Sequence, residues 1–144
     1  MQMTPDDATL DPSRVLADLK ELRALTGTAD GAQRVAFTPT WAAARAWLRG
    51  KLSSIPNVTV KHDPAGNLWA MLPGASDREL LIGGHIDSVP NGGWLDGSLN
   101  TLAGVEILRR LSAAGKPAVT VRLVDWADEE GARFGRSLFG SSCA

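Results

Sequence analysis

The chain has 144 residues, which is enough for one domain with a hydrophobic core. Hydrophobic residues make up 44% and charged residues 22%, and the formal net charge of −1 gives no basis for capture of nucleic acid or of an acidic membrane. No apolar run approaches the roughly 20 residues of a membrane span, and the polar N-terminus does not resemble a secretory signal. A single cysteine excludes an internal disulfide. These features predict a cytoplasmic protein.

Hydrophobic periodicity and turn residues predict three helices, which follow a disordered N-terminus at residues 1–10. The helices are expected at 12–25, 39–52 and 98–113. Asp11 and Thr38, each followed by proline, are the predicted caps of the first two, and Ser98 is the predicted cap of the third. Leu99 is predicted to lie on the apolar face of the third helix.

Four strands are expected between and after these helices, at 58–62, 68–72, 79–83 and 118–125. The first two flank a turn at 63–67, so they are predicted to form a hairpin. Residues 28–37 are predicted to be a loop.

The most informative stretch runs from Leu80 to Gly97, LLIGGHIDSVPNGGWLDG. Its apolar start predicts a buried strand, and the glycines and proline after it predict a loop with sharp turns. This loop carries His85, Asp87 and Asp96. Imidazole and carboxylate groups are donors for a divalent metal, and a carboxylate beside an imidazole fixes its tautomer.

A βαβ unit at 79–125 is predicted to bring a second acidic group to the same place. Its two strands should be parallel, so both should end at one edge of the sheet. The first strand then leads to His85 and Asp87, and the second leads to Glu129 and Glu130. In open α/β sheets this edge is where ligands bind.

These residues suit a metal site. His85, Asp96 and one glutamate supply nitrogen and oxygen donors for zinc, manganese or cobalt, and Asp96 could bridge two ions. The second glutamate could take a proton from water. Two simpler interpretations remain, in which His85 is a satisfied core histidine and the acidic turn at 128–130 is solvated surface. The predicted meeting of His85 and the acidic turn at one sheet edge favours the metal site.

Three other residues could carry chemistry. His62 precedes a turn and is expected at the surface. Trp94 lies inside the candidate metal loop, where it could line a substrate cleft. Cys143 has no basic partner nearby in the sequence, so we expect a buried, inert thiol rather than a nucleophile.

Two segments, GGHIDSVPNGGWLDGSLNTLAGVEIL and VDWADEEGARFGRSLFGSS, resemble the N-carbamoyl-L-amino acid hydrolases and allantoate amidohydrolases. These enzymes form the hydantoinase/carbamoylase family of the dinuclear metallopeptidase superfamily. The resemblance covers most of residues 12–144, including Arg34 and the segment 63–68. The HxD and DEEG motifs, in this order, are specific.

The resemblance implies a role for each residue of the two motifs. His85 matches a ligand of the first metal, and Asp87 matches the carboxylate that orients it. Asp96 matches the bridging ligand, Glu129 the general base and Glu130 the ligand of the second metal. The implied cofactors are two divalent ions, namely zinc, manganese, cobalt or nickel. The implied fold is α/β: a partial, truncated three-layer sandwich of the zinc exopeptidase type, with a central, mostly parallel sheet and flanking helices.

The family also has two downstream histidine ligands and a dimerising lid domain, and no residues of this chain match them. We therefore interpret residues 11–144 as the N-terminal part of a metal-binding catalytic domain, inactive alone, whose full-length form is a homodimer. The truncated sheet should expose a strand edge and apolar surface.

The expected function is metal-dependent hydrolysis of linear amide or ureido C–N bonds in a small molecule, such as an N-carbamoyl amino acid or an allantoate-like compound. An aminoacylase or exopeptidase of the same superfamily is an alternative. A non-catalytic remnant or interaction module is another.

Overall fold

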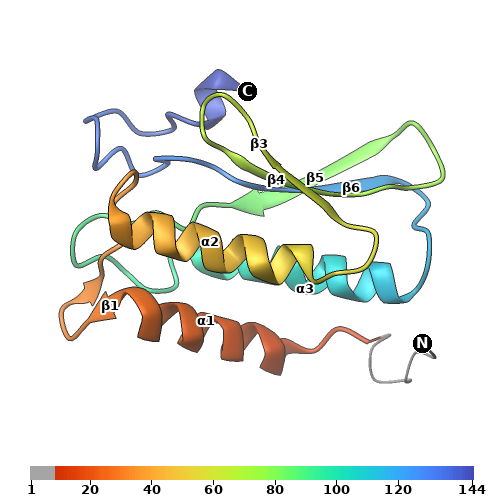
Figure 1. Ribbon diagram of the computed structural model, residues 1–144, viewed down its shortest axis with the longest axis horizontal. Coiled ribbons are helices and arrows are strands. Elements are labelled where there is room, and N and C mark those ends of the chain that lie inside the picture. Colours follow the sequence, from red (N-terminus) through yellow and green to blue (C-terminus); the bar gives the residue numbers. More distant parts are fainter. Residues whose placement is uncertain (1–8) are drawn as a thin grey trace.

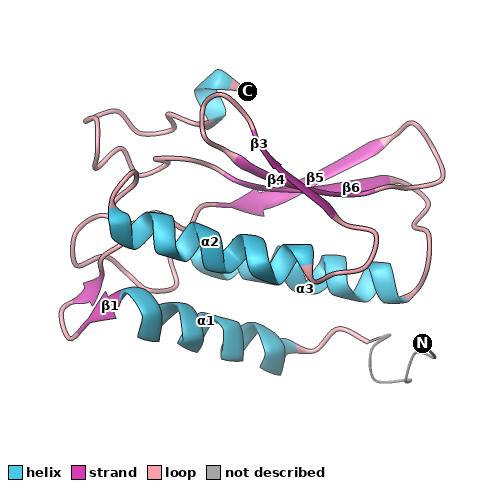
Figure 2. Ribbon diagram, in the orientation of Figure 1, coloured by secondary structure: helices cyan, strands magenta, loops and turns pink. Residues whose placement is uncertain are grey.

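The computed structural model describes residues 9–144 (Figure 1). Disorder was predicted for residues 1–10, and residues 1–8 of this segment lie outside the described residues. The elements in chain order are α1 (Pro12–Thr26), β1 (Gly27–Thr28), β2 (Gly31–Ala32), α2 (Pro39–Ser53), β3 (Thr59–His62), β4 (Leu68–Leu72), β5 (Glu79–Gly84), α3 (Ser98–Ala113), β6 (Thr120–Asp125) and the 3-10 helix η2 (Ser141–Cys143) (Figure 2). Every predicted helix and strand is present, within two residues of its expected bounds. The β1–β2 pair was not predicted, and apart from Gly27 it lies in the segment 28–37 that was expected to be a loop.

The first two helices begin as predicted, and the third does not. Asp11 accepts the backbone N–H of Ser13 at the start of α1, and Thr38 caps α2 in the same way. The residue before α3 is Gly97, at φ +62°, and its start has no side-chain cap. Ser98 was expected to be that cap. It is instead the first helical residue, and its hydroxyl accepts a hydrogen bond from the side chain of Arg34.

The main sheet has the strand order β3-β4-β6-β5. The predicted β3–β4 hairpin is confirmed, and so is the parallel pairing of β5 with β6. The β4–β6 pair is antiparallel, so the sheet is mixed within residues 9–144. The mostly parallel sheet that the resemblance implied is therefore not seen in these residues, because the β3–β4 hairpin joins β6 through an antiparallel pair.

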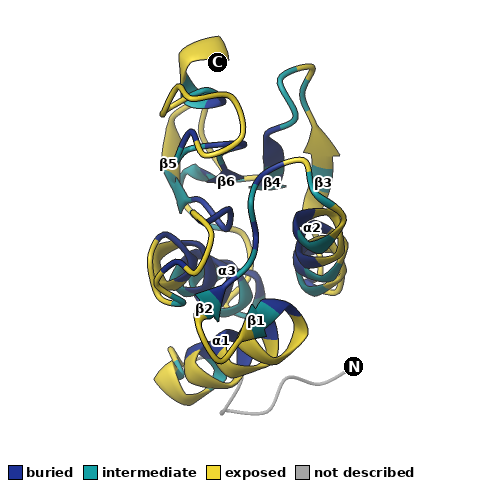
Figure 3. Cartoon of the chain, turned by 90° about the vertical axis from the view of Figure 1, so that its left-hand side faces the viewer, coloured by how far each residue is buried: buried dark blue, intermediate teal, exposed yellow. Residues whose placement is uncertain are grey.

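Helices cover one face of the sheet. Figures 1 and 3 show α2 and α3 beneath the sheet and α1 beneath both helices. The core lies between these layers, where alternate residues of β4 and β6 meet the helices. Its fully buried members include Leu19, Leu48, Leu68, Leu108 and Leu123. No helix in residues 9–144 is both long and apolar enough to cross a membrane.

Strand β5 is at the edge of the sheet, and this overturns one sequence expectation. Leu80 and Leu81 were predicted to be buried, but each is 50% exposed, because no strand in the described residues covers the outer side of β5. The expected exposure of a strand edge with apolar surface is thus present. Leu99, expected on the apolar face of α3, is 44% exposed.

Two leucines of α3 form a matched test of this arrangement. Leu108 is fully buried, so Leu108→Ala should lower the free energy of unfolding by about 2–5 kcal/mol. Leu99→Ala in the same helix should cost less than about 1 kcal/mol, since the side chain already meets solvent. Urea unfolding measures both values, and equal losses would contradict the described packing of α3.

Candidate metal centre

The parallel pair β5–β6 places two loops side by side. Gly84 and Asp125, the last residues of these strands, are paired in register, and the N–H of Trp126 donates to the Gly84 carbonyl at 2.9 Å. The loop after β5 begins with His85, and the loop after β6 leads to Glu129. The predicted meeting of the two motifs at one sheet edge is therefore present.

His85 is the centre of this group. Its Nδ1 lies 3.0 Å from the carbonyl oxygen of Asp87 and 3.6 Å from the Asp87 carboxylate. Its Nε2 lies 3.4 Å from Oε2 of Glu129 and 4.0 Å from Oδ1 of Asp96. In a neutral imidazole the carbonyl contact places the proton on Nδ1, which leaves the Nε2 lone pair facing two carboxylates. Such an arrangement repels unless a proton or a cation stands between the groups.

Asp87 connects the two motifs. Its carboxylate is 1% exposed and accepts the backbone N–H groups of Glu129 at 3.2 Å and Glu130 at 3.1 Å. Burial raises the pKa of Asp87, while these hydrogen bonds and the nearby His85 oppose the rise. The side chain that the sequence singled out as an orienting group thus contacts His85 and fixes the backbone of both glutamates.

Asp96 approaches His85 because a glycine follows it. A Cβ on Gly97 would lie 2.4 Å from ring atoms of His85, and the positive φ of Gly97 also favours glycine. The Asp96 side chain is 67% exposed, so its carboxylate remains open to solvent. Glu130 reaches the group through its backbone, and its side chain is half-buried.

The donor types fit a divalent metal, but the arrangement is partial. An imidazole nitrogen and two carboxylates within 4.0 Å are the chemistry that zinc and manganese sites use. Within residues 9–144, however, no three His, Cys, Asp or Glu side chains are grouped closely enough to hold an ion. Any centre built here therefore needs rearrangement or further donors.

Buried charges support the loops from behind, and the sequence did not predict their roles. Asp125 is 1% exposed, accepts the Ile86 N–H at 2.8 Å and lies 2.9 Å from NH1 of Arg45. Burial raises the pKa of Asp125 to about 6, and Arg45 opposes the rise. Arg34 is fully buried and donates to the Ile86 carbonyl at 2.6 Å. Asp125 is the one of these residues whose role the sequence could have indicated, because it is a charged residue at the apolar end of a predicted strand.

Asp128 differs from the acidic surface turn that was considered. It is fully buried with φ +51°, and its Oδ1 accepts the backbone N–H of Arg133 at 3.3 Å. Its carboxylate therefore shapes the loop after β6. The simpler interpretation of the acidic turn as solvated surface does not hold for this residue.

The remaining candidates lie outside the group. His62 is exposed, as expected. Cys143 was expected to be buried but is exposed, because η2 lies at the surface. Trp94 packs against the core, with the Arg23 guanidinium 5.2 Å from its ring centroid.

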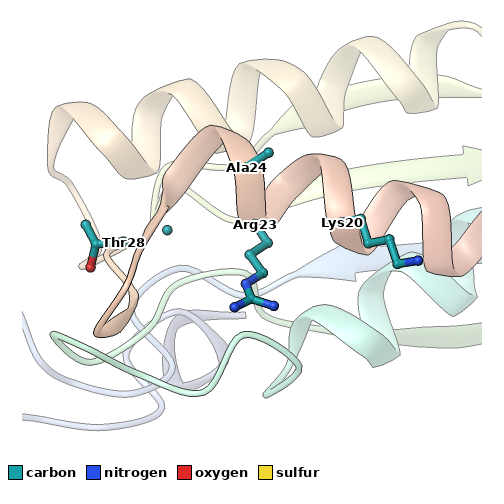
Figure 4. Close-up of a pocket in the computed structure, with 5 residues that line it drawn as sticks. Lys20, Arg23, Ala24 and Thr28 are labelled. Atoms are coloured by element: carbon teal, nitrogen blue, oxygen red, sulfur yellow. The ribbon is translucent and has the colours of Figure 1, made fainter.

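A shallow pocket at the end of α1 is lined by Lys20, Arg23, Ala24, Gly27 and Thr28, none of which belongs to the candidate centre (Figure 4).

Comparison with known proteins identifies similar sequences. The model of peptidase family M28 matches residues 67–143. The N-carbamoyl-L-amino-acid amidohydrolase of Pseudomonas sp. (strain NS671) is 35% identical over 92% of this chain and 33% of its own. The allantoate amidohydrolase of Bacillus subtilis is 33% identical over 77% of this chain and 27% of its own. The chain thus spans about a third of the length of these curated relatives.

Solved structures agree with these similarities. A hydantoinase/carbamoylase family amidase from Burkholderia ambifaria has a TM-score of 0.87 and 33% identity, over 95% of this chain and 34% of its own. A protein assigned as a Zn-dependent exopeptidase from Bacteroides vulgatus has a TM-score of 0.70 over 93% of this chain and 52% of its own. Its identity is 18%, so it supports the fold alone. The predicted α/β fold of the zinc exopeptidase type is confirmed.

The contact of Asp87 with two backbone N–H groups is testable by a nearly isosteric change. Asp87→Asn replaces one accepting oxygen with an NH₂ donor, which must face a backbone donor. We expect the free energy of unfolding to fall by about 1–3 kcal/mol. Asp77→Asn at an exposed position is the control and should change it by less than about 0.5 kcal/mol. Chemical denaturation followed by tryptophan fluorescence measures both, and an unchanged Asp87→Asn protein would refute the described contact.

Proposed function

This chain belongs to peptidase family M28, and we propose that the whole protein is a metal-dependent hydrolase of linear amide or ureido C–N bonds. The observation that supports this most is the convergence of Asp96 and Glu129 on Nε2 of His85 from separate segments. The names of the relatives favour N-carbamoyl amino acids or allantoate-like compounds as substrates.

His85, Asp96 and Glu130 would hold two divalent ions, zinc, manganese, cobalt or nickel, with Asp96 shared between them. A divalent ion lowers the pKa of a bound water and polarises a substrate carbonyl. Catalytic zinc usually has three protein ligands, so the proposal requires donors beyond those that residues 9–144 bring together. We further propose that the whole protein is a homodimer.

Glu129 would act as the general base. Its side chain is 29% exposed, and its backbone N–H is held by the Asp87 carboxylate. In this position Glu129 would take a proton from the attacking water and pass it to the leaving nitrogen as the C–N bond breaks. Asp87 would keep the imidazole of His85 in the tautomer that presents Nε2.

One specific observation favours a second candidate function. The matching family model describes peptidases. An aminoacylase or exopeptidase would use the same residues in the same roles and would differ in the substrate it accepts.

Glu129→Gln separates the base from the metal ligands. We expect turnover to fall about 10²–10⁴-fold, because glutamine cannot accept the proton, while metal content stays close to that of the wild type. Metal analysis and steady-state kinetics measure both. Glu79→Gln, at the far end of β5, is the matched control and should retain activity. Unchanged turnover in Glu129→Gln would exclude this residue as the base.

A substrate panel separates the two candidate functions. We expect the metal-loaded protein to hydrolyse N-carbamoyl amino acids or allantoate and to release ammonia, with little action on N-acetyl amino acids or dipeptides. An ammonia assay and an assay for free amino acids measure these reactions. Preference for dipeptides or N-acetyl amino acids would favour the peptidase or aminoacylase interpretation.

A further inference from the structure

Arg34 is the largest fully buried side chain of the described protein, and each nitrogen of its guanidinium has a hydrogen-bond partner. Its Nε donates to the Ile86 carbonyl at 2.6 Å, NH1 donates to Oγ1 of Thr26 at 3.2 Å, and NH2 donates to Oγ of Ser98 at 2.8 Å. A buried arginine is costly unless its donors are satisfied, so this geometry is closely specified.

The partners of Arg34 belong to both arms of the candidate metal centre. Ile86 lies between His85 and Asp87, and Ser98 begins α3 two residues after Asp96. One planar group therefore fixes the segment that carries the imidazole against the segment that carries the carboxylate. The 4.0 Å separation of His85 Nε2 from Asp96 Oδ1 depends on the relative position of these two segments.

The backbone around Arg34 reinforces this link. The Arg34 N–H donates to Oγ of Ser88 and the Arg34 carbonyl accepts the Ser88 N–H, both at 3.0 Å. Ala32 and Gly92 exchange two backbone hydrogen bonds, of 2.9 and 3.1 Å. A Cβ on Gly31 would lie 2.7 Å from the backbone of Asn91, so the two chains touch closely. Residues 31–34 thus run along the loop that follows β5 and hold it at several points.

We propose that Arg34 is a positioning residue of the metal centre, which sets the distance between His85 and Asp96 by binding the backbone at Ile86 and the hydroxyl of Ser98. This inference rests on the proposed function, since it supposes that these residues hold metal. Arg34 itself binds neither metal nor substrate. Arginine suits this role because its planar fork has several fixed donors, which lysine cannot reproduce.

The test is the affinity of the intact protein for Zn²⁺, measured by competition with a chromophoric chelator. Arg34→Met should weaken Zn²⁺ binding about 10-fold or more, the usual effect of losing a group that orients metal ligands. Arg34→Lys should fall between Arg34→Met and the wild type. Circular dichroism confirms that each sample is folded before titration.

Arg109→Met is the matched control for a merely structural effect. Arg109 is a partly buried arginine that bonds Asp18 at 2.8 Å between α3 and α1. Its loss should lower the melting temperature and change Zn²⁺ affinity by less than about twofold, because it does not contact the loop after β5. If Arg34→Met does not fold, Ser98→Ala removes one of the hydrogen bonds and should weaken Zn²⁺ binding about fivefold.

The outcomes separate the proposed metal site from the positioning role of Arg34. Wild-type protein that binds no Zn²⁺ would overturn the proposed function and this inference with it. Zn²⁺ binding by the wild type that is matched by folded Arg34→Met, or by Ser98→Ala if Arg34→Met is unfolded, would overturn the positioning role alone. A loss of affinity as large in Arg109→Met as in the Arg34 variants would also overturn it.

Discussion

A buried carboxylate, that of Asp87, joins the two halves of the candidate centre. It lies beside His85 after β5 and accepts the N–H groups of Glu129 and Glu130 after β6. Parallel pairing brings the two strand ends together, but it does not fix the loops that leave them. The Asp87 contacts do, because one charged group that is withdrawn from water must satisfy its oxygens with the donors nearest to it.

Buried charged side chains gather around this junction. Arg34, Arg45, Asp87 and Asp125 are at most 5% exposed. Their desolvation is offset by hydrogen bonds to backbone groups and, for Arg45 and Asp125, by an ion pair. Apolar side chains of similar volume would pack well here, but they would leave loop amides and carbonyls unpaired. The charges therefore pair the backbone groups of the loops and hold these loops in one conformation.

The sequence predicted much of this arrangement. The helices, strands and βαβ unit followed from local periodicity, and the meeting of His85 with Glu129 followed from parallel strands. Local patterns could not show that β5 lies at the sheet edge, so Leu80 and Leu81 were expected to be buried. They also could not assign partners across more than 50 residues, as between Arg34 and Ile86. Cys143 was expected to be buried. Its exposure was missed because the neighbouring residues in the sequence do not indicate that η2 lies at the surface.

We propose that His85 and Asp96 hold a divalent metal in the whole protein. The most direct measurement is an anomalous difference map from crystals of the Zn²⁺-loaded protein, recorded at the zinc absorption edge. We expect a peak bonded to Nε2 of His85 and to the Asp96 carboxylate, with Glu129 close by. Zinc bound elsewhere, or fully loaded protein with no peak at His85, would contradict it.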